Sequence, residues 1–154
     1  WSSDVCSSDL IDYSSDMLAR AQQKLPLPGR EVILLQGDAQ NLLVEEASYD
    51  AVIFNLILSV IPDGSACLKE NLRALKPDGR AVVFDKFLPD DNKVTLGRRL
   101  LNLGSTLFGT DITRRFGELV KGSGACVVRD EPSLLHGTYR IIILHKITEY
   151  MKRG

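Results

Sequence analysis

The sequence has almost no net charge, few cysteines and no long apolar run. Nineteen Lys and Arg residues stand against 20 Asp and Glu, a formal net charge of -1, so no broad basic surface favours nucleic acid. No apolar run reaches the length that spans a bilayer. Internal repeats and low-complexity linkers are also missing from the sequence. These absences leave an ordinary globular domain as the expectation.

The three cysteines, Cys6, Cys67 and Cys126, do not have the spacing of a metal or redox site. The first residues lack the basic start and long apolar segment of a signal peptide. An odd number of cysteines without a secretory signal is typical of the reducing cytoplasm. We therefore expect a cytoplasmic protein without a metal centre.

The longest apolar stretch, Ser48 to Asp63, is the segment around which the chain is organised. The whole chain has 154 residues, of which 44% are hydrophobic and 25% charged. This length and composition suffice for one domain with a hydrophobic core. Val and Ile enrichment between turn residues predicts a strand buried on both faces of a parallel sheet, although a helix over part of the stretch stays open. Between Ala51 and Pro62, the polar exceptions are Asn55 and Ser59. In such sheets, ligands bind beyond the carboxyl ends of the strands.

The rest of the chain alternates between short strand patterns and helical patterns. This alternation predicts crossover units and a parallel sheet. Two last strands, separated by Pro132 and Gly137, predict an antiparallel hairpin. Strands are expected at Leu10–Asp12, Glu31–Gln36, Arg80–Phe87, Ala125–Arg129 and Thr138–Lys146. Helices are expected after a Ser14 or Ser15 cap (Met17, Leu18, Ala21, Leu25), around Leu68, Leu72 and Leu75, over Asn92–Phe108, and after Thr110 or Asp111 (Ile112, Phe116, Leu119, Val120).

The first nine residues, WSSDVCSSD, are polar and aperiodic. They resemble a peptide that arises when sequencing-adapter DNA is translated. We expect residues 1–9 to be disordered or foreign, residues 10–147 to form the domain with an incomplete N-terminus, and residues 148–154 to be a tail.

Four motifs occur in a fixed order along the chain: Ile11-Asp12-Tyr13-Ser14, Gly37-Asp38-Ala39, Tyr49-Asp50-Ala51-Val52 and Leu75-Lys76-Pro77-Asp78-Gly79-Arg80. In this order and spacing they resemble the class I S-adenosylmethionine-dependent methyltransferases. The likeness is to the small-molecule branch related to the ubiquinone and menaquinone-type enzymes, and it covers about residues 10–147.

This resemblance implies a Rossmann-like α/β sheet, mostly parallel, with an antiparallel C-terminal hairpin. It implies S-adenosylmethionine as cofactor, with Asp12 on the ribose hydroxyls and Tyr13 beside the adenine. It further implies Asp38 and the backbone of Ala39 at the adenine, and Asn55 at the methionine part. The family's first strand and glycine-rich loop, which precede the position of Asp12, do not occur in this sequence, and that strand lies at the centre of the family's sheet.

Each candidate residue also has a structural explanation. A carboxylate suits vicinal ribose hydroxyls, but Asp12 could serve only the start of a helix. Asp38 could bond its own turn, and Tyr13 could be a partly buried tyrosine. A polar Asn55 on a buried strand costs free energy unless it is paired, either by a ligand or by local backbone.

Catalytic residues are poorly marked. Methyl transfer from a sulfonium is an in-line displacement that alignment and desolvation promote, so no fixed nucleophile is required. Asp85 is the best placed general base, with a surface or turn acid as the alternative. His136 and His145 are expected to be structural. The sequence therefore names no catalytic residue.

The segment Leu96–Val120 combines Arg98-Arg99 and Arg114-Arg115 with several leucines. Basic residues beside an apolar face suit an anionic membrane surface or a lid over a hydrophobic acceptor. The simpler interpretation is a helix packed on the sheet with solvated arginines.

The sequence thus predicts transfer of a methyl group to a small-molecule or lipid-like acceptor, without nucleic acid. One alternative is an NAD-dependent dehydrogenase, in which Asp12 would hold the ribose of NAD. Another is a non-catalytic Rossmann-like binding domain. The acceptor, the base and the oligomeric state are not encoded in any motif of the sequence.

Overall fold

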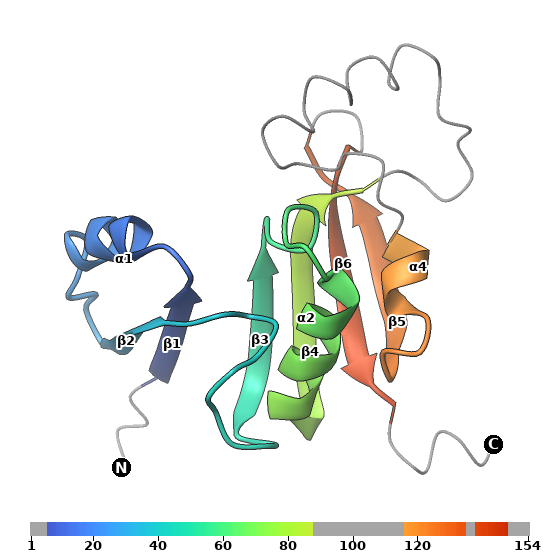
Figure 1. Ribbon diagram of the computed structural model, residues 1–154, viewed down its shortest axis with the longest axis horizontal. Helices are drawn as coiled ribbons and strands as arrows, with labels where there is room; N and C mark the ends of the chain where they lie inside the picture. Colours follow the sequence, from blue (N-terminus) through green and yellow to red (C-terminus); the bar gives the residue numbers. More distant parts are fainter. Residues whose placement is uncertain (1–5, 88–115, 135–137, 148–154) are drawn as a thin grey trace. The chain divides into compact units, whose positions relative to one another are not determined.

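The computed structural model describes residues 6–87, 116–134 and 138–147 (Figure 1). The chain divides into two compact units, with the boundary between Leu43 and Val44. The described strands form a two-stranded sheet in the first unit, in the order β1-β2, and a four-stranded sheet in the second, in the order β3-β4-β6-β5.

The first unit is a strand-helix-strand crossover. It consists of β1 (Cys6–Asp12), α1 (Ser15–Gln22) and β2 (Arg30–Gln36). The strands are parallel, in register from Cys6 opposite Arg30 to Asp12 opposite Gln36, and parallel neighbours need such a crossover. Of the two predicted cap residues, Ser14 is the N-cap. Its Oγ accepts a hydrogen bond from the Met17 N–H at 3.3 Å.

Strand β1 begins earlier than the sequence indicates. Residues 1–9 were expected to be disordered or foreign and the first strand to begin at Leu10, whereas the ladder with β2 starts at Cys6. Parallel pairing uses backbone N–H and C=O groups, which every residue here supplies. A polar Ser-Ser-Asp segment can therefore extend a strand whose apolar part is only Leu10 and Ile11.

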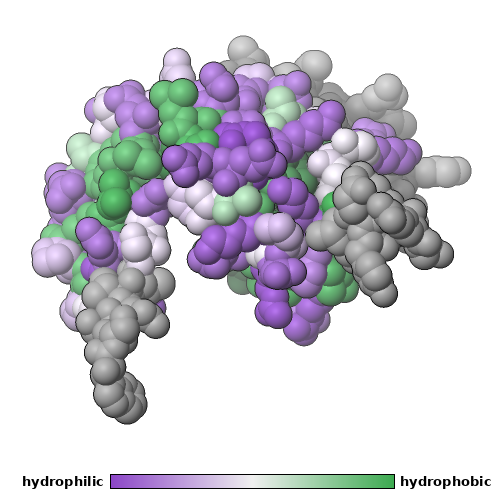
Figure 2. All heavy atoms as spheres, turned by 90° about the horizontal axis from the view of Figure 1, so that it is seen from below, coloured by the Kyte–Doolittle hydropathy of each residue, from purple (hydrophilic) through white to green (hydrophobic). Residues whose placement is uncertain are grey.

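The apolar side chains of the first unit lie mostly at its surface. Leu10 is 44% exposed, Met17 51% and Ile33 45%, whereas Leu42 is buried. The helical face that was predicted around Met17 is therefore only partly covered. Figure 2 shows apolar patches between polar residues on one face of the molecule.

The second unit carries the larger sheet. Strand β3 is parallel to β4, whereas β6 is antiparallel to both β4 and β5. The last two strands confirm the predicted antiparallel hairpin. The elements are β3 (Tyr49–Asn55), α2 (Gly64–Ala74), β4 (Leu75–Lys86), α4 (Phe116–Val120), β5 (Ala125–Pro132) and β6 (Tyr139–Lys146).

The core of this unit lies between the sheet and its helices. Helix α2 packs against β4 and α4, and Figure 1 draws α2 in front of β4. The Phe87 and Phe116 rings meet at 4.9 Å between centroids. The predicted caps Thr110 and Asp111 lie outside the described residues. The largest apolar core residues are Phe54, Leu58, Leu68, Leu72, Leu75, Val83, Phe87, Phe116, Leu119, Ile142 and Leu144.

Strand β3 is not buried on both faces, contrary to the prediction. Among the described strands it has a single neighbour, β4, and lies at the edge of its sheet. Phe54 is 2% exposed, but the adjacent Ile53 is 73% exposed, the alternation of a strand that is covered on one face. The apolar run also does not continue as strand beyond Asn55, because Leu56 has a φ of +56° and a short turn from Ile57 to Ile61 follows it.

The predicted turn Lys76–Gly79 lies within β4, as a bulge. Tyr49 pairs with Leu75 and Ala51 with Arg80, so Asp50 alone faces four residues. Lys76 Nζ is 2.7 Å from Asp50 Oδ1. A Cβ at Gly79 would lie 2.9 Å from the Asp50 carbonyl oxygen and 2.6 Å from Leu75 Cδ1. The close approach of these two backbones is the reason for glycine at this position.

Gly79→Ala should therefore destabilise the second unit by about 1–3 kcal/mol, because the added methyl group has to displace backbone as well as side chain. Urea unfolding followed by circular dichroism measures the change. Asp78→Ala, at the exposed neighbouring position, is the matched control and should change stability by no more than about 0.5 kcal/mol. Equal stability of the two variants would contradict the close contact.

Candidate functional site

Two acidic residues lie at the carboxyl edge of the β1-β2 sheet. Asp12 ends β1 opposite Gln36, and Asp38 follows two residues after Gln36. The Gly37 N–H donates to the Asp12 carbonyl oxygen at 3.1 Å, and Gln36 Nε2 donates to the Tyr13 carbonyl oxygen at 3.1 Å. These bonds hold the segments after the two strands together, so Asp12, Tyr13, Asp38 and Ala39 belong to one edge.

The Asp12 carboxylate has two differently used oxygens. Oδ1 accepts a hydrogen bond from the Ser14 N–H at 2.8 Å, which supports the start of α1, as the structural explanation of this residue expects. No hydrogen-bond partner of Oδ2 is present in the described part of the chain. Asp12 is half-buried. Its carboxylate therefore stabilises local backbone and still has an oxygen that can accept from a ligand.

Asp38 mainly stabilises its own turn. Its Oδ1 accepts from the Gln40 N–H at 2.8 Å and from Gln40 Nε2 at 3.1 Å, and its carbonyl oxygen accepts from the Asn41 N–H at 2.9 Å. This is the turn aspartate of the structural explanation. The turn presents the half-buried Ala39 at the same edge. Tyr13, 79% exposed, is not the partly buried tyrosine of the alternative interpretation.

Asn55 belongs to the second unit, at the carboxyl end of β3. The prediction that it is a polar group on a buried strand is wrong, because Asn55 is exposed and β3 lies at the edge of its sheet. Water can therefore solvate the amide, and burial does not require a ligand to satisfy it. Only its position at a carboxyl strand end still supports ligand contact.

The arrangement that sequence reasoning missed is the pair of Ser59 and Asp85. Asp85 is fully buried at 0% exposure, so the surface alternative is wrong. Asp85 Oδ1 accepts from Ser59 Oγ at 2.6 Å and from the Lys86 N–H at 2.7 Å, and Oδ2 accepts from the Ser59 N–H at 3.0 Å. With three donors on one buried carboxylate, this is an acceptor site rather than an open base. The sequence signal was the polar Ser59 inside an apolar run.

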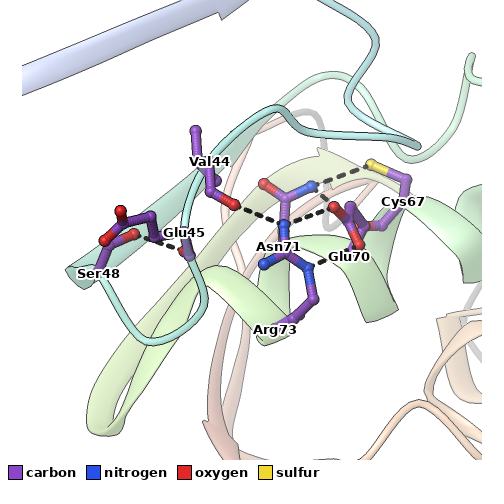
Figure 3. Close-up of polar contacts among 7 residues, drawn as sticks. All are labelled: Val44, Glu45, Ser48, Cys67, Glu70, Asn71 and Arg73. Carbon is purple, nitrogen blue, oxygen red and sulfur yellow. Dashed lines mark hydrogen bonds and ion pairs between the residues drawn. The ribbon is translucent and has the colours of Figure 1, made fainter.

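The loop before β3 is tied to the end of α2 (Figure 3). Arg73 Nη2 donates to the Val44 carbonyl oxygen at 2.9 Å and to Glu70 Oε1 at 2.8 Å, while the Ala47 N–H donates to the Arg73 carbonyl oxygen at 3.0 Å. The hydrogen bond that Arg73 donates to the Glu70 carboxylate raises the pKa of the Arg73 guanidinium above its ordinary value. Helix α2 thereby holds the loop from which β3 begins.

Of the two histidines, His145 lies half-buried on β6, and its carbonyl oxygen is 3.6 Å from Cys126 Sγ. His136 lies outside the described residues, as do Leu96–Arg115 of the arginine-flanked segment. Among the described residues, no helix is long and apolar enough to cross a membrane.

A sequence profile of the family described as "Methyltransferase domain" matches residues 3–83 of the chain. The chain belongs to this methyltransferase family. The matched range contains all five candidate cofactor residues: Asp12, Tyr13, Asp38, Ala39 and Asn55. The resemblance on which that prediction rested is confirmed.

Curated relatives of the chain are similar over about half of its length. The demethylmenaquinone methyltransferase of Lactobacillus johnsonii is 34% identical over 89 residues, which are 56% of this chain and 36% of the relative. The phosphatidylethanolamine N-methyltransferase of Cereibacter sphaeroides is 33% identical over 82 residues, 52% of this chain and 40% of the relative. The chain thus matches well under half the length of these relatives.

Solved structures confirm the Rossmann-like class I fold. The S-adenosylmethionine-dependent methyltransferase from Mesorhizobium loti aligns with a TM-score of 0.68 at 17% identity, over 92% of this chain and 90% of that one. The enzyme from Methanosarcina mazei has a TM-score of 0.69 at 20% identity, over 96% and 85%. The [4+2]-cyclase SpnF reaches 0.73 at 16% identity, over 92% and 67%. A cyclase shares the fold, so the fold alone does not define the reaction.

The two roles of the Asp12 carboxylate are separable by substitution. Asp12→Asn keeps an oxygen for the Ser14 N–H and should change the free energy of unfolding by less than about 0.5 kcal/mol. Asp12→Ala removes that acceptor and should cost about 1 kcal/mol. Thermal unfolding followed by circular dichroism compares the two variants. A loss in Asp12→Asn as large as in Asp12→Ala would show that charge, not the backbone hydrogen bond, supports the start of α1.

Proposed function

We propose that the protein transfers a methyl group from S-adenosylmethionine to a small-molecule or lipid-like acceptor. The carrying observation is the Asp12 carboxylate, which ends a parallel strand with one oxygen available, in a chain of the methyltransferase family. The adjacent Gly37-Asp38-Ala39 turn supports the same assignment, since the register places it at the same edge.

The chemistry of these residues fits S-adenosylmethionine. Asp12 Oδ2 would accept from a ribose hydroxyl in a charge-assisted hydrogen bond. The exposed Tyr13 ring and the turn at Asp38 and Ala39 would contact the adenine, and Asn55 would contact the methionine part. When bound, the cofactor supplies an electrophilic methyl group on its sulfonium. The chain's own contribution is to bind and orient it and to exclude water.

No side chain is assigned as the catalytic base. Asp85 is excluded from this role because its buried carboxylate already accepts three hydrogen bonds. In-line displacement at a sulfonium methyl group depends chiefly on alignment of the acceptor atom. Nothing in this proposal requires a nucleophile from the protein.

The acceptor class is supported by the names of the relatives, which refer to demethylmenaquinone and phosphatidylethanolamine. Both favour a lipid-like acceptor over a nucleic acid, in agreement with the formal net charge of -1. We further propose that the Leu96–Val120 segment contacts an anionic membrane surface. A cytoplasmic location is also part of the proposal. Sedimentation with anionic vesicles tests the membrane contact, and no binding would remove it.

Isothermal titration calorimetry with S-adenosylhomocysteine tests the cofactor assignment. The chain should bind it saturably, and Asp12→Asn should weaken binding about tenfold or more, because an amide NH₂ replaces the accepting oxygen. Asp38→Ala should weaken binding by a similar factor through loss of the turn that presents Ala39. Asp78→Asn, an exposed acid at the far end of β4, is the control and should bind like the wild type.

NAD serves as the competing ligand in the same titration. Tighter binding of NAD than of S-adenosylhomocysteine would favour the dehydrogenase alternative. A chain that is folded by circular dichroism and binds neither ligand would contradict the cofactor assignment. Binding without methyl transfer to any of a broad acceptor panel would favour a non-catalytic domain.

A further inference from the structure

The Ser59–Asp85 pair joins two segments that follow or end neighbouring parallel strands. Ser59 lies in the segment between β3 and α2, and Asp85 is the penultimate residue of β4. Ser59 is 1% exposed and Asp85 0%. Both polar groups of Ser59, its N–H and its Oγ, donate to this one carboxylate. The pair is therefore a complete, buried connection between the two strand ends.

The segment that Ser59 belongs to has an unusual backbone. Leu56 has a φ of +56°, in the left-handed region that costs a non-glycine residue about 1 kcal/mol or more. The Leu56 N–H donates to the Phe84 carbonyl oxygen at 2.9 Å, and the Val60 and Ile61 N–H groups donate to the Ile57 carbonyl oxygen at 3.1 and 2.9 Å. The Leu56–Phe84 hydrogen bond and the fully buried Leu58 already hold part of this segment. Ser59, within the turn, adds a backbone and a side-chain hydrogen bond to Asp85 of β4.

A carboxylate is well suited to this position. It is acceptor-only when ionised and offers two oxygens, which the three donors from Ser59 and Lys86 occupy. An asparagine would turn an NH₂ group toward at least one N–H or O–H donor. Arg140 stands directly opposite Asp85 in the antiparallel register with β6, but its guanidinium forms an ion pair with Asp130 on β5. Arg140 Nε also donates to Asp130 Oδ1 at 2.8 Å.

We propose that Asp85 is a positioning residue that fixes the Leu56–Ile61 segment through Ser59, and that this segment, directly after Asn55, shapes the cofactor edge of the second unit. The proposal rests on the proposed function, because it adds to that site a residue that touches no ligand. In this proposal Asp85, the one fully buried carboxylate among the described residues, keeps the segment ordered and does not transfer a proton.

Hydrogen–deuterium exchange and calorimetry on the full chain test this role together. Asp85→Asn should speed amide exchange in residues 57–61 about tenfold or more, with no change in β5 and β6, and should weaken S-adenosylhomocysteine binding about tenfold. Ser59→Ala removes only the Oγ hydrogen bond and should give a smaller change in the same direction. If Asp85→Asn fails to fold, the Ser59→Ala variant alone tests the proposal. Asp78→Asn removes an exposed charge from the same strand and should match the wild type in both measurements.

Three results would overturn the proposal. Exchange in residues 57–61 could equal that of the wild type in both variants. Exchange could rise evenly over the segment and over β5 and β6, the pattern of a general loss of stability. It could also rise in the segment alone while S-adenosylhomocysteine affinity stays at the wild-type value. Failure of the wild-type chain to bind S-adenosylhomocysteine would overturn the proposed function and the cofactor part with it, while exchange would still decide whether Asp85 orders the segment.

Discussion

Parallel pairing between adjacent strands is the constraint on which the candidate site depends. Parallel strands end at the same edge, so residues far apart in the sequence follow one another along that edge. In the first unit, the register of β1 with β2 brings Asp12 and the Gly37-Asp38-Ala39 turn together. In the second, the pairing of β3 with β4 places Asn55 and the Asp85 region at one edge. Without these registers the four motifs would be only local signals.

The two units use acidic residues in different ways. Asp12 is half-buried and uses one oxygen for its own backbone, so it retains capacity for a ligand. Asp85 is fully buried and accepts from three donors, so it has structural capacity only. Burial and hydrogen-bond count, rather than residue type, therefore separate a binding carboxylate from a supporting one. The same comparison explains why Asp85 was a poor choice of base.

The errors of the sequence analysis arise because apolar pattern and turn composition do not specify which strands become neighbours or in which register. An apolar run such as Ala51–Pro62 indicates burial, but not which layers and neighbours provide it. Strand β3 has one described neighbour, so Ile53 and Asn55 are exposed although the pattern predicted them buried. Strand β1 extends to Cys6 because backbone pairing does not require apolar side chains. Lys76–Gly79 has the composition of a turn, yet it forms a bulge within β4 because Asp50 alone faces it.

The sequence by itself determined the family, the order of the described strands and helices, a serine cap before α1, the buried leucines of α2 and the antiparallel C-terminal pair. These properties depend on local composition, periodicity and motif order, which are legible in one chain. Only the tertiary structure decided that Oδ1 of Asp12 is taken by Ser14, that Asp38 bonds its own turn, and that Ser59 meets Asp85 across 26 residues. Hydrogen-bond partners and burial depend on which strands become neighbours, and the spacing of residues in the sequence does not specify those neighbours.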